Sequence, residues 1–452
     1  MRVLGLAVGV GAGLAAGALA GPAGPRAASS AAEEVVLALE ATHLPPLLRR
    51  PDERLELRYD AYCVRADDDA AEAPCPVEGA VFARAGDRGP YTEVALREEP
   101  SALEGRLRAR LPEQLAAARE VSYYARLQVA GGPVVTIPAG GADAPQRSLA
   151  LSGALEIDLG SHAFGRVRRA AARVARARWG SGSGEVGLEP GRELPPVGGA
   201  SFDVDRRGAV YLLDEANRRV LRWSDGAVAP EAVPLAVNGT LADLAVGEAG
   251  TLYVAETTAA PGATPLLRAF APDGSPRGSV ELAERPARVG RDRDGTSVLQ
   301  HPSGQWLPVV RGERLLPARD QRRGGAAGLR SEDGSEVRVF HAGHELRVAR
   351  LVPGSAVRSW ILRSATTLGE VQLAEPFGAG VVVVVRAYAA DRDEFLVLVL
   401  GPGGLRARFA VEDADWAETA PLSRFRLRGA SLYQLGSSQE GVFVDRFDLE
   451  QA

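Results

Sequence analysis

Apolar and polar residues alternate along most of the chain, and this pattern predicts β-strands. A period of two places every second side chain on one face of a sheet, so each segment can bury one face. About seven short segments separated by turn-forming residues predict a β-sandwich over residues 34–150, with one helical turn at 114–119. The alternation begins at Val35, and the clearest segments are 55–62, 80–84, 91–96, 103–112, 121–129 and 134–138.

A second region of the chain repeats itself. Six times, a glycine stands three residues before an apolar residue, at intervals of 42, 45, 39, 46 and 49 residues between the glycines. A repeat of this length built from short strands is typical of a β-propeller, and six repeats predict six blades. Glycine suits the hairpin of each blade because it adopts a positive φ without a Cβ clash. The pairs are Gly208/Tyr211, Gly250/Tyr253, Gly295/Val298, Gly334/Val337, Gly380/Val383 and Gly429/Leu432.

The last repeat contains three alternating segments, whereas a propeller blade needs four strands. The alternating segment 173–179 precedes the first repeat and is predicted to pair as the outermost strand of the last blade. The six arginines within 162–179 would then lie on an exposed strand edge. A basic patch for an anionic wall polymer or nucleic acid is the alternative. The predicted organisation is a linker at 151–172 and a propeller over 173–452.

Residues 201–223 resemble an NHL repeat, in which a glycine hairpin joins two strands and Asn-x-Arg precedes the third. The glycine-rich lead-in at 179–187 also resembles these repeats. The resemblance implies that Asp214, Asn217 and Arg219 form a structural loop motif held by local hydrogen bonds.

Residues 108–125 resemble the later strands of immunoglobulin-like or fibronectin type III-like domains. Together the resemblances imply a secreted, bacterial, all-β protein. It would have an N-terminal immunoglobulin-like β-sandwich followed by a six-bladed NHL-like β-propeller. RHS and teneurin-type proteins also set an NHL propeller beside a β-sandwich, and only that arrangement is shared.

The N-terminus predicts export. Arg2 is followed by an apolar run that ends in an A-x-A-like sequence at Ala20, which is typical of a secretory signal peptide over 1–20. Residues 21–33 are predicted to form a flexible leader, so that the mature chain begins near Gly21. Retention of the run as a membrane anchor is the alternative. We expect a secreted or cell-surface protein with no membrane span after cleavage.

The chain has two cysteines, Cys63 and Cys75, on either side of a short acidic segment. In an oxidising compartment, one disulfide between them is the simplest interpretation. A metal site or redox pair is the rival, but two thiols are too few for zinc and no C-x-x-C is present.

Composition and charge exclude some functions. The 46% hydrophobic and 25% charged residues are ordinary for a globular protein. The net charge of −5 provides no general basic surface, so nucleic acid is not an expected partner. All 53 basic residues are arginine, which removes lysine-based catalysis and P-loops and is typical of a GC-rich bacterial genome.

No pattern in the sequence indicates catalysis or a metal site, so we predict no catalytic residue, metal or cofactor. Residues 341–345 carry two histidines and a glutamate but match no zinc motif, and a hairpin turn is predicted there. His43, His162 and His301 are isolated. Residues 292–295 lack the further ligands of a calcium loop, and 391–394 are predicted to form a solvated tip.

The function that these features favour is a non-enzymatic extracellular binding or scaffold protein. It would use the propeller loop face and channel mouth to bind an extracellular protein or polysaccharide. One alternative is a metal-dependent propeller enzyme of the lyase or lactonase type, and another is a cell-wall adhesin. Lyase and lactonase sites place His, Asp, Glu or Asn around a central metal. The inner strands here offer no histidine and only Asp203, Asp205, Asp243 and Glu370.

Overall fold

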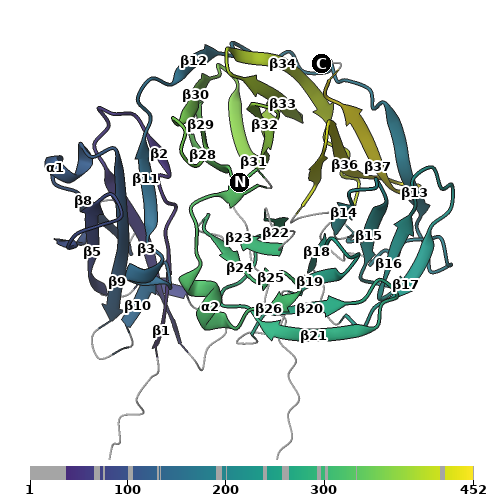
Figure 1. The fold of residues 1–452 in the computed structure, drawn as a ribbon, viewed down its shortest axis with the longest axis horizontal. Coiled ribbons are helices and arrows are strands. Elements are labelled where there is room, and N and C mark those ends of the chain that lie inside the picture. The colour runs from purple at the N-terminus through teal and green to yellow at the C-terminus, as the bar shows by residue number, and fades with distance from the viewer. Residues whose placement is uncertain are drawn as a thin grey trace, which may run out of the picture.

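The chain is almost entirely β-structured (Figure 1). Among the described residues the helices are α1 (Glu113–Ala116), α2 (Ala318–Arg323) and a single 3₁₀ turn at Gly141–Asp143. The all-β prediction is confirmed. The computed structural model describes residues 37–65, 72–74, 77–99, 105–129, 132, 134–189, 196–199, 201–237, 242–256, 264–292, 297–300, 304–331, 333–417 and 423–450.

Two sheets form the N-terminal part of the protein and pack on one core. Alternate residues of β3, such as Tyr59 and Ala61, meet alternate residues of β9, such as Tyr123 and Leu127, in that core. The classification as an immunoglobulin-like sandwich stays a prediction. One sheet contains β1 (Leu37–Thr42), β3 (Glu56–Arg65), β4 (Glu72–Pro74), β7 (Arg97–Glu98) and β8 (Arg106–Arg110). The other contains β2 (Leu48–Arg49), β5 (Val77–Ala85), β6 (Thr92–Ala95), β9 (Glu120–Val129), β10 (Val134–Ile137) and β11 (Gln146–Ala150).

The rest of the chain is a β-propeller, with sheets arranged radially around a central axis (Figure 1). Its first sheets are β14 (Ser201–Val204) to β17 (Glu231–Pro234) and β18 (Ala242–Val246) to β21 (Pro276–Glu281). A three-stranded sheet of β22 (Arg288–Arg291), β23 (Ser297–Gln300) and β24 (Trp306–Pro308) comes next, followed by the hairpin β25 (Val310–Arg311) and β26 (Arg314–Leu315).

Three further sheets complete the ring. The first contains β27 (Leu329–Arg330), β28 (Glu336–Ala342), β29 (Glu345–Leu351), β30 (Arg358–Arg363) and the outer strand β12 (Leu155–Asp158). The second contains β31 (Thr367–Phe377), β32 (Gly380–Tyr388), β33 (Asp393–Gly401) and β34 (Gly404–Glu412). The third contains β35 (Phe425–Arg428), β36 (Ser431–Ser438), β37 (Gly441–Asp448) and β13 (Ala172–Arg178). The remaining strands of the first two blade sheets are β15 (Val210–Asp214), β16 (Arg219–Trp223), β19 (Leu252–Glu256) and β20 (Leu266–Phe270).

The repeat predicted from the glycines corresponds to the hairpin between the first two strands of each sheet. The apolar residue of each pair lies in β15, β19, β23, β28, β32 or β36, which are the second strands. Gly295 lies outside the described residues. Gly380 corrects the expectation, because the positive φ of its hairpin is at Gly378. At Gly380 an added Cβ would lie 1.7 Å from the carbonyl oxygen of Leu400. The hairpin glycines with positive φ are Gly208, Gly250, Gly334 and Gly429.

The ring is closed by strand pairing between its two ends. β13 pairs antiparallel with β37, as predicted, so this prediction is confirmed. Two of the three arginines in β13 form ion pairs with residues of the last hairpin. Arg173 forms a two-pronged ion pair with Asp445, at 2.8 and 2.9 Å, and Arg176 pairs with Glu440 at 2.5 Å.

Part of the linker expected at 151–172 forms a strand of the propeller. β12 pairs parallel with β30, from Leu155 opposite Trp360 to Asp158 opposite Arg363. An edge strand of four residues satisfies the outer backbone groups of β30 without needing a core of its own. This part of the predicted linker is therefore the outermost strand of a blade sheet.

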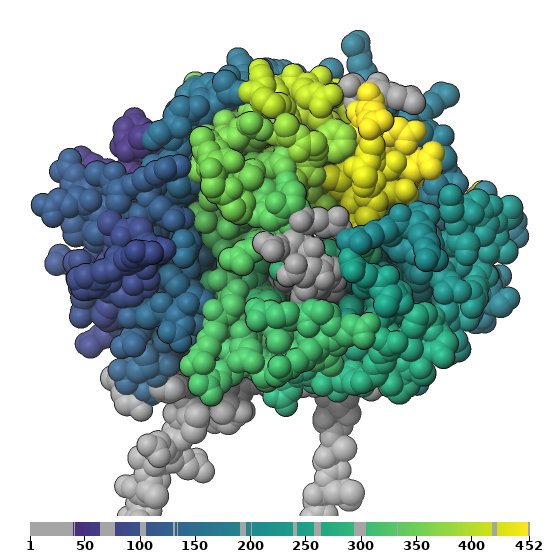
Figure 2. All heavy atoms as spheres, viewed as in Figure 1, coloured from purple at the N-terminus to yellow at the C-terminus, as the bar shows by residue number. Residues whose placement is uncertain are grey.

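The N-terminal domain packs against one flank of the ring (Figure 2). Arg338 is buried between the two parts and donates to Glu120 at 2.8 Å and to Glu336 at 2.6 Å. Gln305 donates to the carbonyl oxygen of Ala144 at 3.1 Å. These buried contacts hold the two domains in one arrangement, which fixes residues 44–47 beside the channel.

The signal peptide, the leader, Cys75 and His301 also lie outside the described residues. The Cys63–Cys75 disulfide therefore stays a prediction. Cys63 is buried and pairs in register with Ala73, two residues before Cys75. Within the described part of the chain, neither helix is long and apolar enough to span a membrane.

Candidate functional site

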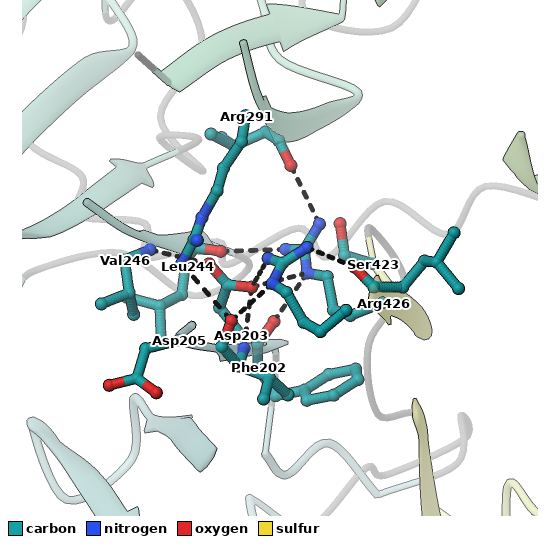
Figure 3. A network of polar contacts seen from close by, with 12 residues as sticks. Phe202, Asp203, Asp205, Leu244, Val246, Arg291, Ser423 and Arg426 are labelled. Carbon is teal, nitrogen blue, oxygen red and sulfur yellow. Dashed lines mark hydrogen bonds and ion pairs between the residues drawn. The ribbon is translucent and has the colours of Figure 1, made fainter. Parts of the chain in front are cut away.

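An arginine from the last blade, Arg426, lies in a polar network among the inner strands of the propeller (Figure 3). In β35, Phe425 and Leu427 pack in the core between the last two blades, and the alternating Arg426 lies on the opposite face of the sheet, from which it reaches the inner strands of other blades. Its guanidinium donates to three main-chain carbonyl oxygens from three other blades. These are the oxygens of Phe202 in β14 at 3.0 Å, Leu244 in β18 at 2.9 Å and Val289 in β22 at 3.0 Å.

Asp243 is the buried counter-ion of this arginine. Its Oδ1 lies 3.3 Å from Nη2 of Arg426 and also accepts the hydroxyl of Ser201. Its Oδ2 accepts the N–H of Val289 at 2.6 Å and the hydroxyl of Ser423 at 2.8 Å. Each oxygen of this buried carboxylate is therefore satisfied, which a charge in this position requires.

Asp203, in the inner strand β14 of the neighbouring blade, binds a second set of arginines. It accepts Arg428, Arg291 at 3.2 Å and the N–H of Val246 at 2.8 Å. Burial alone would raise its pKa, but Arg291, Arg428 and Arg426 together hold the pKa of Asp203 well below its usual range. We call Asp203, Asp243, Arg291, Arg426 and Arg428 the axial network.

Two cavities meet at the axial network, one from each face of the propeller. The hairpin-side cavity, of about 640 Å³, lies among the hairpins and includes Gly208, Asp333 and Gly429. The domain-side cavity, of about 460 Å³, lies between the opposite loop face and residues 44–47 of the N-terminal domain. Both are lined by Val289, Gly290, Glu375 and Arg426, so these residues form the wall between them.

The domain-side cavity is shaped by irregular pairing in β31. The register of β31 against β32 shifts twice, between Leu368 and Leu373, which is the mark of β-bulges. Bulges redirect side chains and are frequent beside functional sites. Here the bulged stretch lines the cavity with Glu370 and Gln372, whose side chains are joined by a 3.1 Å hydrogen bond.

Arg288 extends this polar wall. It donates to the carbonyl oxygen of Gln372 at 2.7 Å. Burial lowers the pKa of Arg288, and the carboxylate of Glu370 is the strongest charge that opposes this effect. The cavity thus presents carboxylate, amide and guanidinium groups on one side.

Trp306 and Phe340 line the same cavity with aromatic rings. An added Cβ at Gly290 would lie 2.9 Å from Cζ3 of Trp306, so the indole packs directly on the glycine backbone. Trp306 and Phe340 are each half-buried. The cavity therefore combines aromatic surface with hydrogen-bonding groups, as small-molecule sites generally do.

Glu375 has no hydrogen bond or ion pair with any described residue. Burial raises its pKa, and the nearby Arg428 and Arg426 oppose this without contacting it. Glu375 is only partly buried, so its carboxyl is accessible from the two cavities that it separates.

The residues predicted as a structural loop motif come together at the start of the propeller. Asp214 accepts the side chain of Asn217 at 2.8 Å and Nε of Arg219 at 2.8 Å. It also accepts the N–H of Gly187 at 2.9 Å. Arg219 donates to the carbonyl oxygens of Gly182 and Glu185. All of these contacts hold the lead-in to the first blade and none faces either cavity.

The candidate metal ligands do not converge. Asp205 accepts main-chain N–H groups of its hairpin, Glu370 lies in the domain-side cavity, and Asp203 and Asp243 belong to the axial network. His341 is in a hairpin and contacts the carbonyl oxygen of Gly343 at 2.7 Å. No group of three His, Cys, Asp or Glu in the described ranges could hold a metal ion.

The solvated tip predicted at 391–394 is wrong for its last residue. Glu394 is buried, and its Oε2 lies 2.7 Å from Nε2 of His162. Its Oε1 accepts the N–H of Gly165 at 2.6 Å. The pair ties the segment before β13 to the base of β33.

Sequence reasoning missed Arg288, Arg426 and Glu375. One signal was available for Arg426, because an arginine that alternates with buried apolar residues in the first strand of a blade lies between blades and needs polar partners there. The charge partners come from distant segments and leave no comparable pattern.

No protein-family model matches the sequence, and no curated protein matches it. Among solved structures, the chain is similar to Kuenenia stuttgartiensis hydrazine synthase (13% identity, TM-score 0.33, 57% of this chain and 88% of that chain). It is also similar to Staphylococcus aureus virginiamycin B lyase (8% identity, TM-score 0.33, 55% and 94%). A third similar structure is YCF48 bound to a D1 peptide (12% identity, TM-score 0.31, 64% and 99%). These likenesses are too distant to assign an activity.

Proposed function

We propose that the protein is a secreted, non-enzymatic binding or scaffold protein of the bacterial cell exterior. In this proposal an immunoglobulin-like sandwich and a six-bladed NHL-like propeller form a composite surface. The ligand, an extracellular protein or polysaccharide, enters the domain-side cavity at the channel mouth.

The state of the axial carboxylates carries this proposal. A metal-dependent lyase or lactonase would need free carboxylates around the axis. Asp203 and Asp243 are instead each bound by arginine and by main-chain N–H groups, and Arg426 fills the position between the inner strands. This favours a rigid, closed floor under a binding site over a catalytic metal centre.

Rigidity also supports binding. The cavity floor is built from inner strands. Residues 44–47 are held against the propeller because Leu47 packs with Ala327 and Ala349, and Arg347 donates to the carbonyl oxygen of the adjacent Leu48 at 3.1 Å. A site that is already ordered before binding loses less entropy when the ligand arrives.

The proposal is tested by blocking the cavity mouth. Leu44 lines the cavity and is 74% exposed, so a Leu44→Cys variant can carry a bulky maleimide without disturbing the core. Val228→Cys, at 98% exposure and away from both cavities, is the matched control. Each immobilised protein is exposed to an envelope fraction of the producing bacterium, and retained material is measured by biolayer interferometry.

We expect wild-type protein and labelled Val228→Cys to retain the same amount, and labelled Leu44→Cys to retain about tenfold less. Equal retention by all three proteins, or no retention by any, would overturn the proposal. Metal-dependent turnover of a lactone or ester, lost when Asp243 is changed to Asn, would favour the enzyme instead.

A further inference from the structure

We propose that the domain-side cavity binds a neutral oligosaccharide, with Trp306 as an aromatic platform and Glu370 and Glu375 as acceptors of sugar hydroxyls. This rests on the proposed function, since it names the ligand class of the same site. It commits to carbohydrate where the broader proposal allows protein or polysaccharide.

The size and place of the cavity suit one or two sugar rings. Its volume of about 460 Å³ falls within the range of roughly 300–1,000 Å³ for small-ligand sites. It also lies at a domain boundary, where such sites are frequent. Leu44 and Pro45 cover one side, so a ligand would contact both domains.

Trp306 provides the surface on which a sugar can pack. The C–H face of a pyranose is apolar and weakly positive, and the electron-rich face of an indole attracts it. The indole is held in place by Gly290, where a side chain would collide with it, and by Arg288, whose Cζ lies 5.9 Å from the ring centroid. A platform fixed in this way loses little freedom on binding.

Hydroxyl groups need acceptors and donors on the opposite side, and β31 supplies them. Glu375 has no protein partner within the described residues, and Glu370 uses one of its oxygens for Gln372. Each carboxylate can therefore accept further hydrogen bonds. Arg288 and the amide of Gln372 act as donors to sugar oxygens. A ligand rich in hydroxyls is what this arrangement of groups can satisfy.

The charges of the cavity favour a neutral sugar. Arg426 is already paired with Asp243, which leaves Arg288 with Glu370 and Glu375, so the lining has no excess positive charge to attract a uronate or a sulfated sugar. The wall also sets the aromatic rings of Trp306 and Phe340 beside scattered polar groups, which suits a sugar better than a peptide.

The test uses isothermal titration calorimetry on the full mature protein. The probes are cello-, malto- and chito-oligosaccharides as neutral sugars, oligogalacturonate as an anionic sugar, and an acidic peptide. The variants are Trp306→Ala, Trp306→Phe and Glu370→Gln, with Trp416→Ala as the matched control. Trp416 is 41% exposed and lines neither cavity.

We expect at least one neutral oligosaccharide to bind wild-type protein. Trp306→Ala should weaken binding about tenfold or more, Trp306→Phe and Glu370→Gln by a few-fold, and Trp416→Ala not at all. If Trp306→Ala fails to fold, the phenylalanine variant and the maleimide-labelled Leu44→Cys protein provide the same comparison. Absence of neutral-sugar binding, tighter binding of oligogalacturonate or peptide, or an equal loss in Trp416→Ala would overturn the inference.

Treatment of the envelope fraction distinguishes failure of the carbohydrate proposal from failure of the proposed binding function. Periodate cleaves vicinal diols of sugars, and a protease removes protein. Retention that is blocked by the Leu44 label and abolished by periodate supports both proposals. Retention that is blocked by the label but abolished only by protease overturns the carbohydrate ligand and leaves the binding function standing. If labelled Leu44→Cys protein retains as much material as wild-type protein, the proposed function itself is overturned.

Discussion

Arg426 and Asp243 are 183 residues apart in the sequence, yet Nη2 of the arginine lies 3.3 Å from Oδ1 of the aspartate at the axis of the propeller. The arginine comes from the last blade and the aspartate from the second sheet of the ring. The pair therefore joins the inner strands of two blades that are not neighbours in the ring. Closure of the ring depends on this contact as well as on the strand β13.

Replacement of Arg426 by leucine should destabilise the protein strongly. It would leave three carbonyl oxygens without this donor and the buried carboxylate of Asp243 without its cationic partner. Removing one partner of a buried pair typically lowers the free energy of unfolding by about 3–5 kcal/mol. Chemical denaturation of Arg426→Leu measures the loss. Arg176→Leu, which breaks an exposed pair, should lower it by less than about 1 kcal/mol. Equal effects of the two substitutions would contradict the role of the axial network.

The hairpins of the blades could be predicted because their signal is local. A glycine and an apolar residue three positions later, as in Gly208 and Tyr211, belong to a single hairpin. The pairing of β13 was predictable for a similar reason, since a blade with three strands lacks one and only one alternating segment was left over.

Other features depend on contacts between distant segments and could not be predicted. The sequence predicts Glu394 in a solvated tip because its partner, His162, is 232 residues away. It predicts β12 as part of a linker because these four residues gain a role only against β30. The same holds for Glu375, whose importance comes from the cavity on either side of it.

The expected Cys63–Cys75 disulfide can be tested by thiol counting on denatured, secreted protein. Mass spectrometry should find no free thiol before reduction and two after it. Because the loop is short, Cys75→Ser should lower the free energy of unfolding by roughly 2–3 kcal/mol under oxidising conditions. Under reducing conditions the variant and the wild-type protein should be nearly equal in stability. Two free thiols in the unreduced secreted protein would refute the disulfide.

Gly441 allows β13 and β37 to lie close together. An added Cβ would lie 2.0 Å from the carbonyl oxygen of Ala177 in β13. We expect Gly441→Ala to lower the free energy of unfolding by about 1–3 kcal/mol beyond the cost of its positive φ. Gly404→Ala is the matched control, since Gly404 also has a positive φ and nothing lies within 4 Å of the added atom. If both variants lose the same stability in denaturant, the close approach of the two strands is not important for closure.

His43 should make the stability of the protein depend on pH. It is buried between Tyr59 and Tyr123, and burial lowers its pKa from 6.5 to about 4, against a weaker opposing effect of its hydrogen bond to Arg58. Between these two values the unfolded chain binds a proton that the folded protein does not, so the contribution is lost as pH falls from about 7 to about 4. The difference corresponds to about 3 kcal/mol at the acidic end.

Denaturant unfolding of wild-type protein and of His43→Gln, followed across this range, isolates the effect because all other groups are shared. The wild-type curve should fall relative to that of the variant, while His344→Gln, exposed in its hairpin, should follow the wild type. Parallel curves for wild type and His43→Gln would show that the folded protein accepts the proton as readily as the unfolded chain.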